Sequence, residues 1–488
     1  MKRSIAVALG IALVLAAASA RVAQARNPHC AGGIQYVSIA LRDKEKGNFE
    51  DYQREIHKAV DQLTQCTQED PADVEALGYL AWAYAEVDSA RLAGEMFDKA
   101  IAGLKAKGDA KKADWASTNR ESYWATAFND GIAKINAAQT AYPNFMKKPE
   151  NEADVTLKGE AKKSYDQALV SLTRASRLRP GDPKTLRNLG SVHAFMGDYQ
   201  QAEAVFREGL KGAPGDSLLL ESVKTARINY ASQLTDEKKF DEAIAFYQEL
   251  IKADSTNPDL YLGLADATFK RAQSKQGDAR KPDFKGAGDA YAAAARLKPT
   301  NADLSFNAAL AYQNAGESAL AEPLWRTTLK LRPDDVDALS ALGQALADLQ
   351  KYQDAIRALW EGLNRDAKNK TLHRQLGAVY TKANNNPKST EELMVYLALQ
   401  NGTPIQDMTA AAKSAKAGTP RAQTLASAGM PEQIVPWEIQ GEKVETWFYW
   451  GKKLAHHFKG DQLYVKSDWS APDLRTAVTP PTTGARPK

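Results

Sequence analysis

The chain has very few cysteines and histidines for its length. Its 488 residues include two cysteines, Cys30 and Cys66, and six histidines. It contains no H-E-x-x-H sequence and no closely spaced cysteine pair, the patterns through which many proteins hold zinc. His456 and His457 are adjacent, and neighbouring residues of a strand point to opposite faces, so the two are poorly placed to ligate one ion. We therefore predict neither a metal site nor a cofactor.

The sequence also lacks the motifs of the common enzyme classes. It has no glycine-rich nucleotide-binding loop and no nucleophile constellation. Its charge excess is small, because the formal net charge is +4 at pH 7 and loss of Lys2, Arg3 and Arg21 with an N-terminal leader would leave +1. These absences favour a protein that is not an enzyme and does not bind nucleic acid.

Long apolar runs are confined to the N-terminus. Lys2 and Arg3 precede the apolar run from Ile5 to Ala20, and Ala23-Gln24-Ala25 matches a signal cleavage site. We expect residues 1–25 to be a cleaved signal peptide, with an uncleaved membrane anchor as the alternative. No later run is long enough to span a bilayer, so we expect an exported mature chain without a stable membrane span, in a bacterial periplasm.

One pattern is present in abundance. Residues 183–216 read PKTLRNLGSVHAFMGDYQQAEAVFREGLKGAPGD. Leu186, Leu189 and Gly190 fall on one face of a first helix. The pair Gly197-Asp198 ends that helix, and a second helix of the same periodicity follows. The segment therefore predicts a helix hairpin.

This hairpin unit recurs along the chain. Units beginning at Ala302 and Val336 lie 34 residues apart, with small residues where helices would cross closely and large ones between them. In this the chain resembles the tetratricopeptide repeat family. About nine units begin near Gly33, Val74, Arg120, Pro183, Lys224, Pro258, Ala302, Val336 and Lys370. We predict a mostly α fold, a helix-hairpin solenoid over residues 26–402, whose stacked units share one core.

The two cysteines flank the first predicted unit. Cys30 lies just before its first helix, and Cys66 lies near the end of its second. Because antiparallel helices bring the start of one beside the end of the other, we predict a disulfide between them. Two unpaired thiols are the alternative.

The resemblance implies that the first helix of each unit lines a concave groove. Asparagine recurs beside the packing face, and an amide that both donates and accepts suits the backbone of an extended peptide. One unit carries Gly263 instead, so the three-unit set with which family members hold a terminal carboxylate is incomplete. The candidate partner-binding residues are Arg187, Asn188, Phe195, Asn229, Phe269, Lys270, Phe306, Asn307, Gln313, Arg374 and Gln375. The alternative is a groove with incidental polar residues.

Two units are interrupted between their helices, by residues 142–159 and residues 271–283. Both insertions are polar and contain proline, so we predict loops. Because they fall at the same point of the unit, they would project from one edge and form a candidate contact rim. Neutral surface excursions are the alternative.

The last part of the chain departs from the repeat. We predict two capping helices over residues 403–428, a three-stranded β-meander over residues 429–470 and a flexible tail over residues 471–488. The capping helices would cover one face of the meander. Because Glu445 shares the side of Trp447, we expect Trp450 to be buried and Trp447 to lie nearer solvent, with the histidines half-exposed.

The meander segment is also similar to the end of small outer-membrane lipoproteins that assist β-barrel assembly. The shared residues are Gly429-Met430, Glu445-Thr446-Trp447, Phe458 and Gly460. The leading hypothesis is an exported scaffold that binds a protein or extended peptide in its groove. The alternatives are an envelope assembly factor that docks through the meander, and a module that binds glycans through Trp447, Tyr449 and Trp450.

Overall fold

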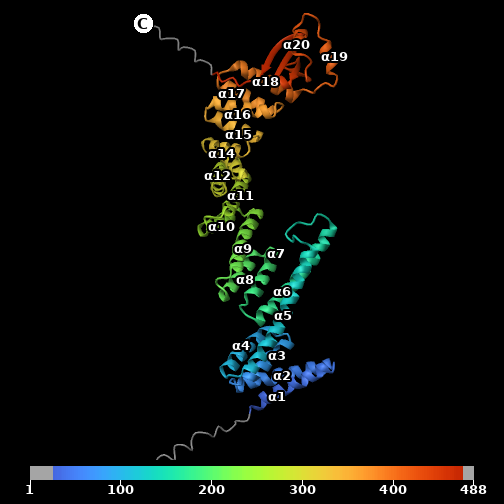
Figure 1. Ribbon diagram of the computed structural model, residues 1–488, viewed down its shortest axis with the longest axis vertical. Helices are drawn as coiled ribbons and strands as arrows, with labels where there is room; N and C mark the ends of the chain where they lie inside the picture. The colour runs from blue at the N-terminus through green and yellow to red at the C-terminus, as the bar shows by residue number, and fades with distance from the viewer. Residues whose placement is uncertain (1–25, 476–488) are drawn as a thin grey trace, which may run out of the picture. The chain divides into compact units, whose positions relative to one another are not determined.

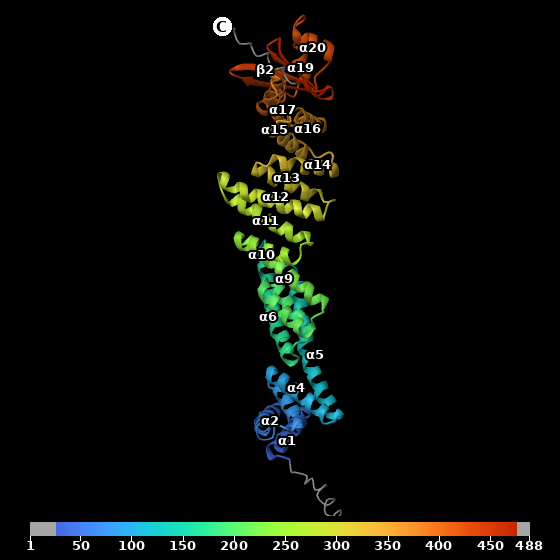
Figure 2. The ribbon, with the colours of Figure 1, turned by 90° about the vertical axis from the view of Figure 1, so that its left-hand side faces the viewer.

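The structure is a computed structural model that describes residues 26–475. The predicted signal peptide lies outside the described residues. The chain forms two compact units, one up to Tyr230 and one from Ala231 onward. Among the described helices, none is both long enough and apolar enough to cross a membrane. Figures 1 and 2 give two views of the helices and strands.

The first unit is a succession of helix hairpins, in which α1 pairs with α2, α3 with α4, α5 with α6 and α7 with α8 (Figure 1). Its helices are α1 (Pro28–Glu45), α2 (Phe49–Glu69), α3 (Val74–Glu86), α4 (Ala90–Ala106), α5 (Ala110–Ala141), α6 (Glu152–Leu178), α7 (Pro183–Phe195), α8 (Tyr199–Gly212) and the first part of α9 (Ser217–Asp236). Consecutive hairpins share one core of buried alanine, leucine and aromatic side chains. This is the stacking that the repeat predicts.

The second unit continues the same arrangement. Helices α11 and α12, α13 and α14, α15 and α16, and α17 and α18 pack as successive hairpins. The helices are α10 (Phe240–Ala253), α11 (Pro258–Ser274), α12 (Lys281–Leu297), α13 (Ala302–Ala315), α14 (Ser318–Leu331), α15 (Val336–Asp348), α16 (Tyr352–Arg365), α17 (Lys370–Lys382) and α18 (Asn386–Asn401), with a 3-10 helix η1 (Gly277–Arg280) before α12. The predicted count of nine repeat hairpins is approximate. Helix α9 crosses the boundary between the two compact units, so its hairpin belongs wholly to neither of them.

Side-chain caps explain why the first helix of a unit begins where it does. A carboxylate or amide oxygen accepts a backbone N–H of the first turn, which satisfies a donor that the helix leaves free. The capping residues of α3, α7, α11, α13, α15 and α17 are Asp73, Asp182, Asn257, Asn301, Asp335 and Asn369. These six helices begin at the residues that the repeat predicts. The predicted starts at Gly33, Arg120 and Lys224 lie inside longer helices.

Small residues allow the helices of a hairpin to approach closely. A side chain at Gly190 of α7 would lie 2.4 Å from the ring of Phe206 in α8. Gly263 of α11 allows a similarly close approach of the preceding helix α10, because an added Cβ would lie 2.4 Å from the ring of Tyr247. The predicted partner-binding residues together form the groove stripe. Its recurring asparagines, Asn188, Asn229 and Asn307, are therefore interrupted at Gly263 by a packing requirement.

Cys30 and Cys66 form the predicted disulfide. Their Cα atoms lie 4.8 Å apart, and both side chains are fully buried between α1 and α2. The Asn27 side chain accepts the N–H groups of His29 and Cys30 and so caps α1 at the same place. The bond therefore joins the two ends of the first hairpin.

The loop prediction is correct for the first part of the first insertion and is wrong for most of the second. In the first insertion α6 begins at Glu152, capped by Asn151, so the loop spans only residues 142–151. In the second, α11 continues to Ser274, and η1 and α12 follow almost at once. Proline permits this because Pro282 lies in the first turn of α12, where a missing N–H costs no helical hydrogen bond. The insertions therefore lengthen two hairpins.

The C-terminal part carries a four-stranded antiparallel sheet in the order β1-β2-β3-β4. It follows α19 (Met408–Lys413) and α20 (Pro420–Ala428) and contains β1 (Gln433–Ile439), β2 (Glu442–Tyr449), β3 (Leu454–Lys459) and β4 (Gln462–Asp468), with a 3-10 helix η2 (Trp450–Lys452) between β2 and β3. The prediction had three strands and missed β1, which contains Pro436. Because β1 is an edge strand, a residue without an N–H is tolerated there.

Both faces of this sheet are covered. Residues of β2 and β3 on one face, Trp447, Tyr449 and Phe458 among them, pack against Ala412 of α19 and the partly buried Leu425 of α20, as predicted for the capping helices. The other face packs against α18 through Met394, Val395 and Ala398. The sheet is therefore enclosed between two sets of helices.

The predicted exposure of the two tryptophans is wrong. Trp447 is fully buried and Trp450 is half-buried. Trp447 can be buried because Glu445 accepts a hydrogen bond from its indole N–H at 2.6 Å and also pairs with Arg421, so Glu445 does not mark a solvent face. Trp450 lies beyond the end of β2, where the strand alternation no longer applies, and stacks on Phe448 with ring centroids 4.2 Å apart.

The predicted tail is described only up to residue 475, and its first residues make contacts with the helices; residues 476–488 lie outside the described part of the chain. The backbone N–H of Asp473 donates to the hydroxyl of Tyr380 at 3.1 Å, and Asn385 donates to the Asp473 carboxylate at 3.3 Å. Upstream, the indole of Trp360 donates to the carbonyl of Trp469 at 2.9 Å. Residues 469–473 therefore run along the last hairpins of the second unit.

The disulfide generates a stability prediction. The two cysteines are 36 residues apart, and closing such a loop stabilises a folded chain by about 4 kcal/mol in the chain-entropy model. We expect the variant Cys30→Ser/Cys66→Ser to lose stability in α1 and α2 selectively. Hydrogen exchange along the chain measures this, with α7 and α8 as internal controls. Unchanged protection of α1 and α2 would contradict the prediction.

Candidate functional site: a groove cavity in the first unit

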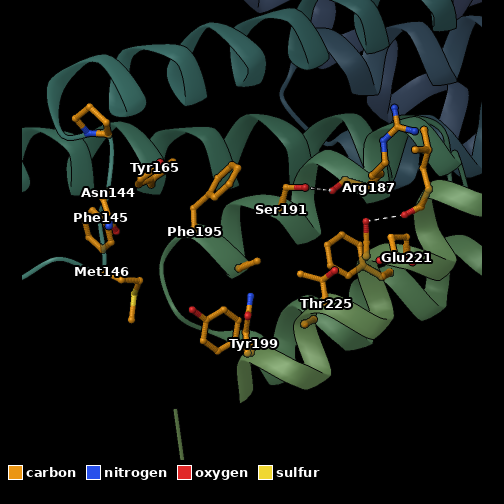
Figure 3. Close-up of a pocket in the computed structure, with 17 residues that line it drawn as sticks. Asn144, Phe145, Met146, Tyr165, Arg187, Ser191, Phe195, Tyr199, Glu221 and Thr225 are labelled. Atoms are coloured by element: carbon orange, nitrogen blue, oxygen red, sulfur yellow. Dashed lines mark hydrogen bonds between the residues drawn. The ribbon is translucent and has the colours of Figure 1, made fainter. Parts of the chain in front are cut away.

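The first unit contains a cavity of about 560 Å³. Its walls come from the loop 142–151 and from helices α6, α7, α8 and α9 (Figure 3). The lining residues are Pro143, Asn144, Phe145, Met146, Tyr165, Arg187, Ser191, Ala194, Phe195, Tyr199, Phe206, Leu218, Glu221, Ser222, Thr225, Ala226 and Asn229. The cavity therefore joins part of the predicted stripe to part of the first insertion.

One end of the cavity is aromatic and apolar. Figure 3 shows Phe145, Met146, Tyr165, Phe195 and Tyr199 gathered there. The Tyr165 ring contacts those of Phe145 and Phe195, with centroids 5.5 Å and 6.0 Å apart. Met146 keeps 48% of its surface exposed and Phe195 keeps 37%, so two large apolar side chains are accessible to a ligand here.

The other end is polar. Arg187, Ser191, Glu221 and Thr225 lie there in Figure 3. The Ser191 hydroxyl donates to the backbone carbonyl of Arg187 at 2.9 Å, which leaves its lone pairs available to a ligand. Within the described part of the chain, no carboxylate lies within ion-pair distance of the Arg187 guanidinium. This end can therefore bind polar groups of a ligand.

The wall formed by the loop 142–151 is held in place by its own contacts. The Lys158 ammonium donates to the carbonyl of Lys147 at 2.9 Å and lies 5.1 Å from the centre of the Phe145 ring. Met146 packs where α7 turns into α8, at Gly197. Gly197 has φ +86°, and a Cβ there would lie 2.9 Å from Met146, so a glycine serves both the turn and the loop.

The cavity brings together only some of the predicted partner-binding residues. Arg187, Phe195 and Asn229 line it. Asn188 does not, because its amide donates to the carbonyl of Lys184 in its own helix at 2.8 Å. Asn307 lies half-buried in the second unit, where this cavity does not extend.

Several stripe residues of the second unit make packing contacts. The Gln313 side chain accepts the indole N–H of Trp325 at 3.0 Å, and the ring of Phe306 lies edge-on to that indole. The other residues of the stripe lie as follows: Phe269 contacts Phe284, Lys270 pairs with Asp266 at 3.0 Å, Gln375 accepts a hydrogen bond from Ser340, and Arg374 is exposed.

Sequence reasoning missed the loop residues of the cavity. Phe145 and Met146 were counted as part of a polar insertion. Two adjacent large apolar residues in such a segment are a signal that could have indicated a covered or ligand-facing wall. Tyr165 and Leu218 were missed because they lie outside the stripe of first-helix positions.

The histidine pair lies in the sheet, far along the chain from this cavity. His456 and His457 point to opposite faces, as predicted, because they are consecutive residues of β3. The prediction that they are half-exposed is wrong: His457 is fully buried and His456 is 8% exposed. His457 bonds to the hydroxyls of Thr446 at 2.8 Å and Ser467 at 3.0 Å, which replace the water it loses.

Burial keeps both imidazoles neutral. Desolvation lowers the pKa of His456 to about 4, with a contribution from the positive charge of Lys466. Desolvation likewise lowers the pKa of His457 to about 3. The described residues hold one group of potential metal ligands, Cys30, Cys66 and Asp73, in which the two sulfurs are bonded to each other.

Comparison with known proteins agrees with the fold. Residues 185–218 and 306–366 match sequence models of the tetratricopeptide repeat. The chain is 28% identical over 191 residues to cellulose synthase operon protein C of Pseudomonas fluorescens (strain SBW25), a match that covers 39% of this chain and 14% of that protein. These matches identify tetratricopeptide repeats within the chain, and proteins built from such repeats generally serve as scaffolds for protein interactions.

Solved structures that resemble part of the chain include YrrB, described as a tetratricopeptide repeat protein, and MamA. YrrB, described as having an unusual peptide-binding site, is 21% identical, with 40% of this chain and 92% of YrrB covered and a TM-score of 0.31. MamA is 18% identical, with 35% of this chain and 94% of MamA covered and a TM-score of 0.30.

The buried histidines make the C-terminal sheet sensitive to acid. Their pKa values lie below the ordinary value of 6.5, so the unfolded state binds more protons as the pH falls below about 6.5. The neutral histidines make their full contribution to the free energy of unfolding above that pH. This free energy decreases by a few kcal/mol as the pH falls toward about 4. Tryptophan fluorescence during urea unfolding measures this, because Trp447 and Trp469 are buried in the sheet region.

A matched variant isolates the histidine contribution. His456→Gln/His457→Gln has lower stability at neutral pH, but its stability should change less between pH 7 and about pH 4.5 than that of the original chain. Equal pH dependence in both proteins would show that other groups control the acid response.

Proposed function

We propose that the protein is an exported, non-enzymatic scaffold of the cell envelope that binds a segment of another protein in the groove cavity of its first unit. The observation that carries this proposal is the pairing of accessible apolar side chains with polar groups in one cavity. Met146 and Phe195 offer an apolar anchor site, and Arg187 offers a cation without a partner among the described residues. This combination is suited to a peptide segment in which an apolar residue is followed by polar groups.

The dimensions of the cavity support a peptide as the occupant. A volume of about 560 Å³ accommodates a few residues in extended form but not a folded domain. The hydroxyls of Ser191 and Thr225 and the amide of Asn229 provide donors and acceptors for a peptide backbone along the wall. Specificity would then come from the aromatic end.

Export is proposed from the N-terminal sequence and from the disulfide. Disulfides persist mainly in oxidising compartments, and Cys30 and Cys66 form one. The name of the Pseudomonas relative adds one class of partner to test, namely components of a cellulose-synthesising system.

The two alternative functions, glycan binding and docking of an assembly partner, would both use the C-terminal sheet region and have less support. Trp447 and Tyr449 were candidates for stacking against a sugar, but both are buried, which leaves Trp450 as the accessible member of that set. Docking of an envelope assembly partner would use the helices α19 and α20 and the largely exposed edge strand β4. Binding of a protein segment in the groove cavity is the leading proposal, because this cavity combines accessible apolar side chains with convergent polar groups.

The groove proposal predicts which substitutions abolish partner capture. Purified chain immobilised without its first 25 residues would be used to capture proteins from an envelope extract, with quantification of each captured protein. Phe195→Ala should reduce capture of groove partners by about tenfold or more, because a large apolar contact contributes about 1.5–3 kcal/mol. Asn229→Ala should reduce it by a smaller factor.

Asn188→Ala provides the matched control, because Asn188 occupies the same helix as Phe195 but does not line the cavity. It should leave capture unchanged. If capture is unaffected by Phe195→Ala and Asn229→Ala, the cavity is not the binding site, and the surface formed by α19, α20 and the edge strand β4 becomes the next one to test.

A further inference from the structure

A second, smaller pocket lies in the first unit between α3, α4 and α5. It has a volume of about 270 Å³ and is lined by Glu75, Gly78, Tyr79, Leu104, Lys111, Lys112 and Trp115. The residues belong to the start of α3, the end of α4 and the start of α5. It shares no residue with the groove cavity.

Two aromatic rings form the main wall of this pocket. Tyr79 and Trp115 lie with ring centroids 4.8 Å apart and planes tilted by 45°. Trp115 keeps 36% of its surface exposed, although it lies beside the core of the unit. Gly78 has no side chain, so the indole lies directly over α3, with the position of an added Cβ 3.4 Å from the ring. The buried Leu104 completes an apolar floor.

At the rim of the pocket, Lys112 has an ion-pair partner and Lys111 does not, among the described residues. Lys112 pairs with Glu75 at 2.9 Å, and Arg26 reaches the same carboxylate at 3.3 Å and Asp73 at 2.7 Å. Lys111 also lines the pocket, and among the described residues no carboxylate lies within ion-pair distance of its ammonium. The rim therefore presents one unpaired positive charge next to an apolar pocket.

We propose that this pocket anchors one bulky apolar side chain of a partner protein whose neighbouring residues are acidic. The volume is below the range typical of sites for drug-sized ligands, so it suits a single side chain. The exposed indole provides apolar contact for that side chain, and Lys111 provides the complementary charge for a carboxylate beside it. The assignment does not depend on the groove cavity, and the partner could use either site alone.

The test uses short fluorescent peptides and the full chain. The probe is a glutamate-rich peptide with one central leucine, and the comparison probes replace that leucine by alanine or the glutamates by lysine. Fluorescence anisotropy should show saturable binding of the first probe only. Trp115→Ala should weaken binding by about tenfold or more. Lys111→Glu should weaken it by about fivefold at low salt and by less at high salt.

Controls separate this pocket from folding defects and from the groove. Lys163→Glu makes the same charge change on an exposed part of α6 and should leave binding unchanged. Trp115→Phe keeps an aromatic ring and should retain most of the affinity, and circular dichroism should show unchanged helix content for every variant. Phe195→Ala, which tests the groove cavity, should not affect this peptide.

The inference is overturned if no acidic peptide binds saturably, if the alanine or lysine probes bind equally well, or if Trp115→Ala has no effect. It is also overturned if a neutral glucan oligosaccharide binds in a Trp115-dependent manner and the peptides do not, because the pocket would then stack sugars.

Discussion

The structure depends on one packing constraint: a helix hairpin of this kind cannot bury its apolar face by itself. In each unit the buried alanine and leucine side chains of one hairpin are covered by the next hairpin along the chain. This requires close helix approach, which explains contacts such as Phe206 against Gly190. It also leaves some first-helix positions beside the packing face, of which Arg187 and Phe195 line the groove cavity.

The same constraint destabilises the two ends of a repeat array, since a terminal hairpin has a neighbour on one side only and its other apolar face stays uncovered. At the N-terminal end the chain joins α1 to α2 with the Cys30–Cys66 disulfide. At the C-terminal end α18 packs against the four-stranded sheet, and residues 469–473 continue along α16 to α18 through Trp469 and Asp473. The sheet is therefore a covering element for the last hairpin, whatever further role it has.

Much of the fold follows from the sequence alone, for physical reasons. Helix starts at Val74, Pro183, Pro258, Ala302, Val336 and Lys370 were predictable because a capping Asp or Asn precedes each of them and the apolar period follows. The disulfide was predictable from hairpin geometry. Strand β1 and the exposure of Trp447 were not, because they depend on long-range contacts: Pro436 is acceptable only at a sheet edge, and Glu445 is satisfied by Arg421, a residue 24 positions away. The candidate site was predictable in part: Arg187, Phe195 and Asn229 follow the repeat period, whereas Phe145 and Met146 reach the cavity only through the path of an inserted loop.

We propose the groove cavity of the first unit as the place where a partner binds. Hydrogen exchange of the chain with and without a captured partner tests this most directly, because it reports on every segment in one experiment. A partner bound in the cavity should slow exchange in the loop 142–151, in α7 and in the part of α9 that contains Glu221 and Asn229. Protection confined to the β-strands and to α19 and α20, with α7 unchanged, would contradict it.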